Sequence, residues 1–310
     1  MVSVHSLSTT RALLQQGDKL DFQEKYSGYL NSVEQVIDAF CDGLNCKPDI
    51  LNESLKYTLK LGGKRFRPVL MYAVGELLGV DLKKLEYFAL ATELIHTYSL
   101  IHDDLPALDN DDFRRGKPSS HKVFGEANAI LAGDGLLNTA YSVLLRECKK
   151  GGEYISASEQ ICDCAGIYGM IAGQSADLKY ENERNYSEKA LNFIHLNKTS
   201  KMIVAPCVVP SILCGGKYYP ELKAFGESLG LLFQFTDDIL DVEGQFDLLG
   251  KSIGKDKNEG KFTSVNLYGL ENCKLRADLL AKKCSAILEG IEGDRQFLSE
   301  LVRFVRDRNK

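Results

Sequence analysis

The sequence predicts an all-α fold, a single-domain bundle of long antiparallel helices around a deep central cavity. Apolar residues recur at spacings of three and four along most of the 310 residues. No run of alternating apolar and polar residues predicts a strand, and no Pro-, Gly- or Ser-rich linker divides the chain. In such bundles ligand groups project inward from facing helices.

The first helices follow from where the apolar pattern starts and stops. Apolar residues at helical spacing cover residues 22–40 and 51–59, and Gly62-Gly63 ends the second stretch. Pro68 suits an early position of the next helix, because its φ is already helical and its missing N–H would have no partner there. We expect that helix to end at Gly79.

The helix that follows should be long and largely enclosed, because an apolar stripe keeps a seven-residue repeat over residues 85–102. Small residues between Glu126 and Leu137 would let two helices approach closely. At the N-terminus, residues 1–20 are expected to be flexible, and residues 21–310 are expected to form the single domain.

Composition argues against several classes of protein. A net charge of −5 gives no global basic field, so no nucleic-acid partner is expected. No apolar run reaches the roughly 18 residues that a membrane span requires. Nine cysteines without a C-x-x-C pair favour reduced, structural thiols in a reducing compartment, and we expect a cytoplasmic protein.

A first cluster of carboxylates, Asp103, Asp104 and Asp109, follows the stripe over residues 85–102. Pro106 is disfavoured inside a continuous helix, so we expect the chain to bend after Asp104 and to bring Asp109 back toward the first pair. The C-terminal end of a helix is already partly negative, which makes uncompensated carboxylates unfavourable there. The arrangement therefore favours a bound cation.

A second cluster holds Asp237, Asp238 and Asp241. On a helix Asp237 and Asp241 lie about 40° apart on one face, with Asp238 to the side. Oxygen-only ligand sets suit Mg²⁺, which is usually shared between one or two carboxylates and substrate phosphates. One such cluster could be a solvated surface, but two clusters after apolar stretches favour two half-sites for a magnesium-diphosphate complex.

Basic residues gather beside the glycine breaks and the acidic clusters. The turn Gly62-Gly63-Lys64-Arg65-Phe66-Arg67-Pro68 places three cations at a helix start, where N–H groups and guanidinium forks favour phosphate oxygens. Arg114 and Arg115 follow the first acidic cluster, Lys198 opens a later segment, and further lysines over residues 251–261 follow the second cluster. A basic turn seen alone is more often an ordinary surface turn than an anion-binding site. The alternation of charges instead favours one diphosphate neutralised through Mg²⁺ and another neutralised by arginines and lysines.

These motifs resemble the trans-isoprenyl diphosphate synthase (polyprenyl synthetase) family, in particular its bacterial short-chain farnesyl and geranylgeranyl diphosphate synthases. The matching blocks keep the family's order and are GGKRFRP (62–68), HTYSLIHDDLPALDNDDFRRGKPSSH (96–121), GMIAGQSADL (169–178), KTSKM (198–202), FQFTDDILD (233–241) and LGKSIGKDKNEGKFT (249–263). The resemblance implies a Mg²⁺-dependent homodimer that condenses isopentenyl diphosphate with an allylic diphosphate. Farnesyl diphosphate is the expected product, and geranylgeranyl diphosphate is the alternative.

The resemblance also implies roles position by position. The residues implied to hold Mg²⁺ are Asp103, Asp104, Asp109, Asp237 and Asp241. Those implied to contact the allylic diphosphate or its allyl group are Arg114, Lys198, Thr199, Gln174, Gln234, Lys251 and, as a weaker match, Lys261. Those implied to bind isopentenyl diphosphate are Lys64, Arg67, His96 and Arg115, and Gly63 is implied to bind substrate. The catalytic set is Asp103, Asp104, Asp109, Lys198, Thr199 and Asp237. Without its motif, His96 would be assigned as a satisfied core histidine.

Product length should depend on residues one turn before the first acidic cluster, because they face the growing hydrocarbon tail. These residues are Tyr98 and Ser99, and the Tyr98 ring should block a tail that a smaller residue would admit. Tyr98 and the two-residue insertion within the first cluster resemble the bacterial farnesyl type, although geranylgeranyl synthases share the insertion.

Two other functions deserve comparison. A class I terpene cyclase also uses aspartates and Mg²⁺, but it acts on one diphosphate and typically replaces the second aspartate cluster with a mixed motif. A regulatory subunit with the same fold should have lost some acids, and none is lost here. Both are less favoured than the synthase.

Overall fold

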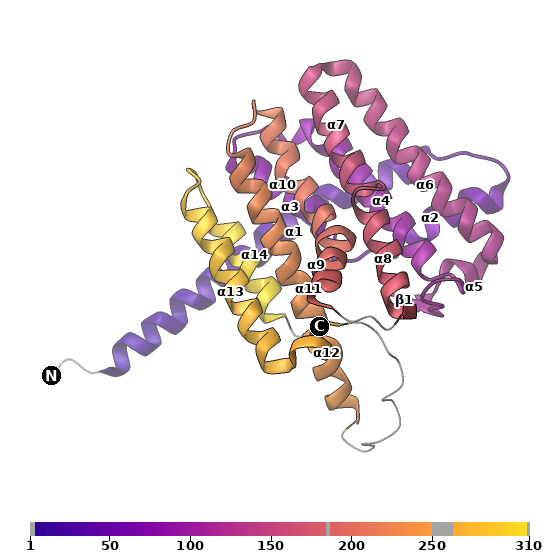
Figure 1. The fold of residues 1–310 in the computed structure, drawn as a ribbon. Helices are drawn as coiled ribbons and strands as arrows, with labels where there is room; N and C mark the ends of the chain where they lie inside the picture. Colours follow the sequence, from indigo (N-terminus) through magenta and orange to yellow (C-terminus); the bar gives the residue numbers. More distant parts are fainter. Residues whose placement is uncertain (1–3, 184–186, 250–262, 309–310) are drawn as a thin grey trace.

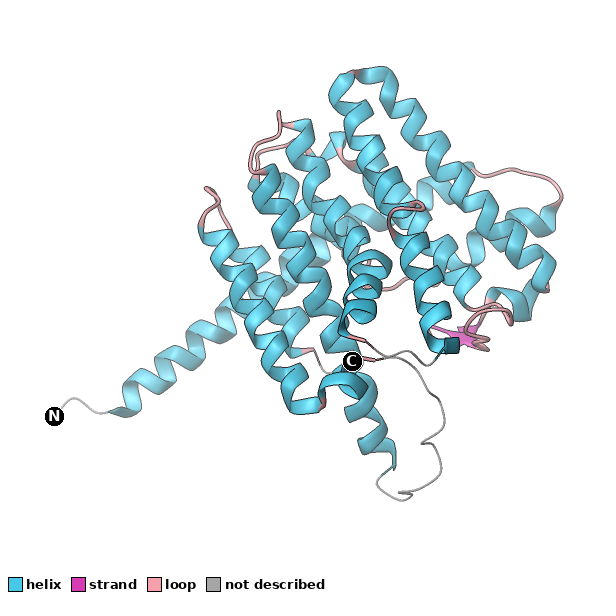
Figure 2. Cartoon of the chain, viewed as in Figure 1, coloured by secondary structure: helices cyan, strands magenta, loops and turns pink. Residues whose placement is uncertain are grey.

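The computed structural model describes residues 4–183, 187–249 and 263–308. Figure 1 shows a helical bundle, and Figure 2 shows that helix dominates the chain and that strand is confined to one small hairpin. The all-α prediction is confirmed. The helices of the first half are α1 (Val4–Gly43), α2 (Asp49–Lys60), α3 (Phe66–Leu77), η1 (Leu82–Lys84), α4 (Glu86–Asp103), α5 (Ser120–Phe124), α6 (Glu126–Glu147) and η2 (Cys148–Lys150). Those of the second half are α7 (Gly152–Ala165), α8 (Met170–Glu183), α9 (Glu188–Ile194), the π-helix η3 (His195–Ser200), α10 (Lys201–Leu213), α11 (Tyr219–Leu249), α12 (Ser264–Tyr268), α13 (Leu270–Glu289) and α14 (Gln296–Asp307).

Helix α10 is the centre of the bundle, because it packs against α3, α7 and α11 and every residue from Met202 to Ser211 is buried. A helix that is apolar all round is stable only when other helices enclose it. One contiguous apolar core extends from Phe22 in α1 to Val305 in α14. The backbone of residues 4–20 continues α1, and the expected flexibility of residues 1–20 and the single domain over 21–310 stay predictions.

Helices α4 and α6 pack closely, as the small residues between Glu126 and Leu137 predict. A Cβ atom added at Gly133 would lie 2.1 Å from Nε2 of His102, so any larger residue would displace the His102 ring. The His102 ring in turn makes a 3.1 Å hydrogen bond with the Ile130 carbonyl oxygen. This contact fixes α6 beside the last turn of α4, where the first acidic cluster begins.

A short antiparallel hairpin, β1 (Phe113–Arg114) and β2 (Lys117–Pro118), follows the first acidic cluster. Arg115 and Gly116 form its turn with φ values of 53° and 75°. Two positive φ values match the right-handed twist of a two-residue hairpin. The strands are too short to produce an alternating pattern, which is why the sequence did not predict them.

Candidate active site

The first acidic cluster folds back on itself as predicted. Helix α4 ends at Asp103, and the Asp109 N–H donates a 2.8 Å hydrogen bond to the Asp103 carbonyl oxygen. The intervening turn therefore returns Asp109 to the helix end. Burial raises the pKa of Asp103 to about 6, and the neighbouring carboxylates of Asp109 and Asp104 add to the rise against the opposing effect of Lys198.

Asp104 is 1% exposed and is paired with the hairpin. Arg114 Nε donates to Asp104 Oδ1 over 3.0 Å, and Nη2 lies 3.4 Å from Asp111 Oδ2. Burial raises the pKa of Asp104, while this guanidinium lowers it. The contact of Arg114 with an allylic diphosphate stays a prediction, and in the described residues Arg114 balances a carboxylate of the first cluster.

The second acidic cluster lies on α11, with Asp237 and Asp241 one turn apart. Burial raises the pKa of Asp237 to about 6, Asp241 adds to the rise, and Arg308 opposes it. Arg308 Nη2 lies 2.5 Å from Asp237 Oδ1 and 2.9 Å from the Phe233 carbonyl oxygen, and its guanidinium stacks on the Phe233 ring. The end of α14 therefore reaches the acidic cluster.

Asp238 faces a different set of partners. Its Oδ1 accepts a 2.9 Å hydrogen bond from Gln234 Nε2, and its Oδ2 accepts a 2.7 Å bond from the Ser264 N–H. The Oε1 atom of Gln234 in turn accepts a 2.9 Å hydrogen bond from the Thr199 hydroxyl. Both oxygens of the 4% exposed Asp238 are thus used within the protein, in line with its predicted position to the side of Asp237 and Asp241.

Lys198 and Thr199 lie in the π-helix η3, which packs against α8 and α11. Lys198 Nζ lies 2.6 Å from Asp177 Oδ2 on α8. The backbones approach so closely that a Cβ atom at Gly173 would lie 2.0 Å from the Lys198 nitrogen. A π-helical turn changes the direction of successive side chains, and such turns are frequent at functional sites.

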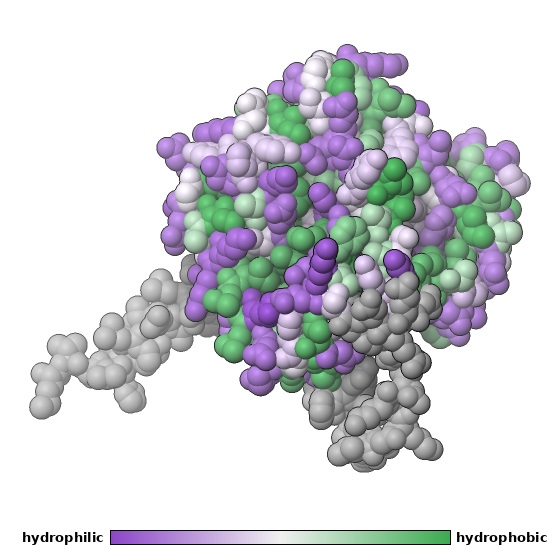
Figure 3. Space-filling view, viewed as in Figure 1, coloured by the Kyte–Doolittle hydropathy of each residue, from purple (hydrophilic) through white to green (hydrophobic). Residues whose placement is uncertain are grey.

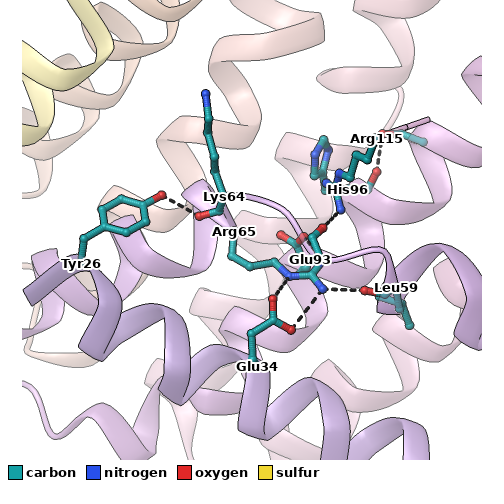
Figure 4. Close-up of polar contacts among 10 residues, drawn as sticks. Tyr26, Glu34, Leu59, Lys64, Arg65, Glu93, His96 and Arg115 are labelled. Atoms are coloured by element: carbon teal, nitrogen blue, oxygen red, sulfur yellow. Dashed lines mark hydrogen bonds and ion pairs between the residues drawn. The ribbon is translucent and has the colours of Figure 1, made fainter. Parts of the chain in front are cut away.

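Figure 4 shows Lys64 of the basic turn before α3, with His96 and Arg115 close to that turn. Arg115 Nη1 donates to the Gly62 carbonyl oxygen. Gly63 has a φ of 128°, and a Cβ atom there would lie 2.7 Å from Arg115 Cζ, so this position requires glycine.

His96 is neutral in this setting, because burial holds its pKa well below the usual value and Arg67 and Arg115 lower it further. A neutral imidazole can donate one hydrogen bond without adding charge. The Nε atom of Arg67 is buried and has no hydrogen-bond partner among the described residues, so a donor there awaits an acceptor.

A cavity of about 530 Å³ is lined by some of these groups. Its lining includes residues of the basic turn and α4, and residues of α6, α8 and η3. The predicted site residues among them are Arg67, His96, Tyr98, Ser99, Asp103, Gln174, Lys198 and Thr199. The buried Oε1 of Gln174 has no hydrogen-bond partner among the described residues. The structure thus brings these eight residues, which come from both substrate assignments and from the chain-length pair, around one cavity, whereas Asp104, Asp109, Asp237 and Asp241 do not line it.

Two predicted site residues, Lys251 and Lys261, lie outside the described residues. Two residues with direct contacts to the site were missed from the sequence, Asp177 and Arg308. Asp177 follows Gln174 by about one helical turn, which is the signal that could have identified it. Arg308 lies 71 residues from Asp237 along the chain, and no local pattern connects them.

Magnesium fits the chemistry of the acidic clusters, because every donor is an oxygen and burial raises the pKa of both Asp103 and Asp237. Raised pKa values show that nearby positive charge does not fully offset the cost of burying these carboxylates in their ionised form. In the part of the chain that the structure describes, no three His, Cys, Asp or Glu side chains converge as a complete cation site.

Comparisons with known proteins agree with this arrangement. A family model described as Polyprenyl synthetase matches residues 48–292. The farnesyl diphosphate synthase of Escherichia coli is 39% identical over 301 residues, which cover 94% of this chain and 100% of the relative. A chloroplastic geranylgeranyl pyrophosphate synthase of Capsicum annuum is 41% identical over 250 residues, covering 79% of this chain and 68% of the relative.

Solved structures show the same similarity. The crystal structure of a geranyltransferase from Legionella pneumophila superposes with a TM-score of 0.81 at 33% identity, covering 94% of this chain and 98% of the other. The aspartate clusters, the basic turn and the cavity lie within residues 48–292, apart from the contact made by Arg308. The chain belongs to the polyprenyl synthetase family.

Proposed function

We propose that this protein is a short-chain trans-prenyltransferase that condenses isopentenyl diphosphate with dimethylallyl or geranyl diphosphate and releases farnesyl diphosphate. The observation that supports this most directly is one cavity with carboxylates at Asp103 and a separate basic turn at Arg67. Two oppositely charged sites suit two diphosphates that are neutralised in different ways.

The allylic diphosphate would lie between the two acidic clusters. When bound, Mg²⁺ would be held by Asp103, Asp104, Asp109, Asp237 and Asp241 and would neutralise the departing diphosphate. Lys198 adds a fixed positive charge on the cavity side. Gln234 Oε1 accepts a hydrogen bond from the Thr199 hydroxyl, so the lone pairs of the Thr199 oxygen are available to a developing carbocation.

Isopentenyl diphosphate would occupy the basic turn, where Lys64, Arg67 and Arg115 supply charge and neutral His96 supplies a hydrogen bond. The allylic C–O bond breaks and its electron pair leaves with the diphosphate. The double bond of isopentenyl diphosphate then attacks the allylic carbon, and the released diphosphate takes the proton lost from C2. The apolar cavity wall keeps water from the cation.

The product length is proposed to depend on Tyr98, which is 6% exposed and lines the cavity with Ser99. The Tyr98 ring packs edge-on against His102 with ring centroids 5.7 Å apart, and His102 in turn lies against Gly133 of α6. Geranylgeranyl diphosphate is the second candidate product, because the Capsicum annuum relative bears that name at similar identity.

We further propose a homodimer in the cytoplasm. All nine cysteines are free thiols, as suits a reducing compartment. Figure 3 shows apolar patches between polar side chains on the face viewed. Exposed apolar residues on α6 and its neighbours support an interface, and they include Ile130, Leu131, Leu145, Ile155, Ile167 and Tyr168. No helix within the described residues is both long and apolar enough to span a bilayer.

The proposal is tested by incubating the purified chain with Mg²⁺, isopentenyl diphosphate and, in turn, C5, C10 and C15 allylic diphosphates. Products are identified by chromatography and mass. A C15 end product is expected from the C5 and C10 starters. Consumption of an allylic diphosphate without isopentenyl diphosphate would instead indicate a cyclase, and no turnover of the isolated chain would favour a regulatory subunit.

A further inference from the structure

Arg65 differs from the other cations of the basic turn because its side chain is completely buried. Its Nε lies 2.8 Å from Glu34 Oε1 on α1, and its Nη1 lies 2.9 Å from Glu93 Oε1 on α4. Its Nη2 donates to the Leu59 carbonyl oxygen at the end of α2 over 2.5 Å. Figure 4 shows this guanidinium pointing away from the Lys64 side chain and into the junction of these helices. Arg65 therefore does not offer its charge to a ligand.

The backbone at Arg65 explains why such anchoring is needed. Its φ of 42° is left-handed, a conformation that residues other than glycine adopt at a cost of about 1 kcal/mol or more. Arg65 is also the N-cap of α3, and its carbonyl oxygen accepts from the Val69 N–H over 3.0 Å. The strained residue thus connects the turn to α3, and its side-chain contacts hold it in that conformation.

Arg65 also balances the charge of the buried Glu93 carboxylate. This carboxylate is 1% exposed, and it acts electrostatically on both Arg67 and Arg115. Its Oε2 has no hydrogen-bond partner among the described residues. A buried carboxylate beside the basic turn would repel an incoming diphosphate if its charge were not balanced. The guanidinium of Arg65 supplies that balance at 2.9 Å.

We propose that Arg65 is a positioning residue for the isopentenyl diphosphate site. Locked between Glu34 and Glu93, it fixes the turn that presents Lys64 and Arg67, and it neutralises the carboxylate beside Arg67 and Arg115. Arg65 touches no substrate. This inference rests on the proposed function, because it assigns the basic turn to the homoallylic diphosphate.

The test is Arg65→Gln, which keeps polar character but removes the charge and the fork. The KM for isopentenyl diphosphate is expected to rise about tenfold, while the KM for the allylic diphosphate and kcat change less than about twofold. Calorimetry with isopentenyl diphosphate alone should show the same loss of affinity, since no turnover occurs without an allylic diphosphate. If Arg65→Gln folds poorly, Glu34→Gln is the milder substitute, because the Glu34 carboxylate is 33% exposed. It should raise the KM for isopentenyl diphosphate by a smaller factor.

Arg295→Gln is the matched control, because Arg295 also binds backbone carbonyl oxygens, those of Leu288, Glu289 and Ile291, at a helix junction away from the cavity. It should lower thermal stability and leave both KM values unchanged. An unchanged KM for isopentenyl diphosphate in Arg65→Gln, or equal rises in both KM values, would overturn the inference. Turnover by the unsubstituted protein is measured first, so failure of the proposed function is recognised separately.

Discussion

At the scale of single residues, the site is built on carboxylates that are unfavourable without a ligand. The pKa of Asp103 and that of Asp237 both rise to about 6 from the usual value of 3.8, mainly because of burial. A raised pKa in the folded state means that the folded protein binds these protons more tightly than the unfolded chain. These two carboxylates therefore contribute to the stability of the metal-free protein at acid pH, and that contribution is lost as the pH rises through about 6.

Magnesium binding should have the opposite dependence, because only the ionised carboxylate is a ligand. Between about pH 7.5 and about pH 5.5, protonation of Asp103 and Asp237 should raise the Mg²⁺ activation constant about tenfold. The measurement is a Mg²⁺ titration of the initial rate at each pH. Mg²⁺ affinity for inorganic diphosphate alone, in the same buffers, is the control. An activation constant that follows only this control would contradict the prediction.

Tyr98 provides a prediction on specificity. Tyr98→Ala should lengthen the product beyond C15, because each added isoprene unit buries CH₂ groups worth about 0.8 kcal/mol apiece once the ring no longer obstructs the tail. Ser99→Ala is the matched control, since it removes a hydroxyl from the next residue of the cavity wall without opening comparable space. Mass spectrometry of the products decides. An unchanged C15 product from Tyr98→Ala would show that another residue sets chain length.

At the scale of elements, the π-helix η3 depends on its close contact with α8. Gly173→Ala places a Cβ atom 2.0 Å from the Lys198 nitrogen, and backbone cannot yield as a flexible side chain can. Displacement of Lys198 and Thr199 should lower kcat by about tenfold or more, since small misplacements of reacting groups are costly. The assay is kcat at saturating substrates, together with the melting temperature.

Gly28→Ala tests the same chemical change in open space. Gly28 lies in α1 with nothing within 4 Å of an added Cβ atom. This variant should keep its kcat and gain about 0.5–1 kcal/mol of stability, because alanine favours helix. If Gly173→Ala retained full kcat, the geometry of η3 would not be important for the reaction.

The limits of sequence reasoning are clear at this scale. The end of α4 at Asp103 and the return of Asp109 could be predicted, because Pro106 excludes a continuous helix. The inward direction of the Arg65 side chain could not be predicted, because the sequence does not distinguish a buried arginine of a basic turn from an exposed one. The contact between Arg308 and Asp237 could not be predicted either, because it depends on how α14 packs against α11.

At the scale of the whole molecule, the exposed apolar residues of α6 are the most direct guide to assembly. Leu131 is 55% exposed and belongs to the surface proposed for the homodimer. Leu131→Glu should place charges in that interface and convert the dimer to a monomer, because an unpaired charge is expensive to bury. Light scattering coupled to gel filtration measures the mass.

Leu279 on α13 is the control for this change, since it is 64% exposed and lies on a different part of the bundle. Leu279→Glu should leave the mass of the assembly unchanged. A dimer that persisted in Leu131→Glu, or that was lost equally in both variants, would argue against an interface centred on α6.

The opposite charges of the acidic clusters and the basic turn have a consequence for how two similar substrates reach their binding positions. A bare diphosphate is repelled by Asp103 and Asp237 and attracted by Arg67 and Arg115, whereas bound Mg²⁺ lowers the net negative charge of a diphosphate and weakens both its repulsion by the carboxylates and its attraction to the arginines. The protein would then sort its substrates by metal speciation as well as by hydrocarbon shape. The free magnesium concentration around the enzyme would set the fraction of allylic substrate able to enter, and excess magnesium would inhibit by masking the isopentenyl diphosphate that the basic turn must receive bare.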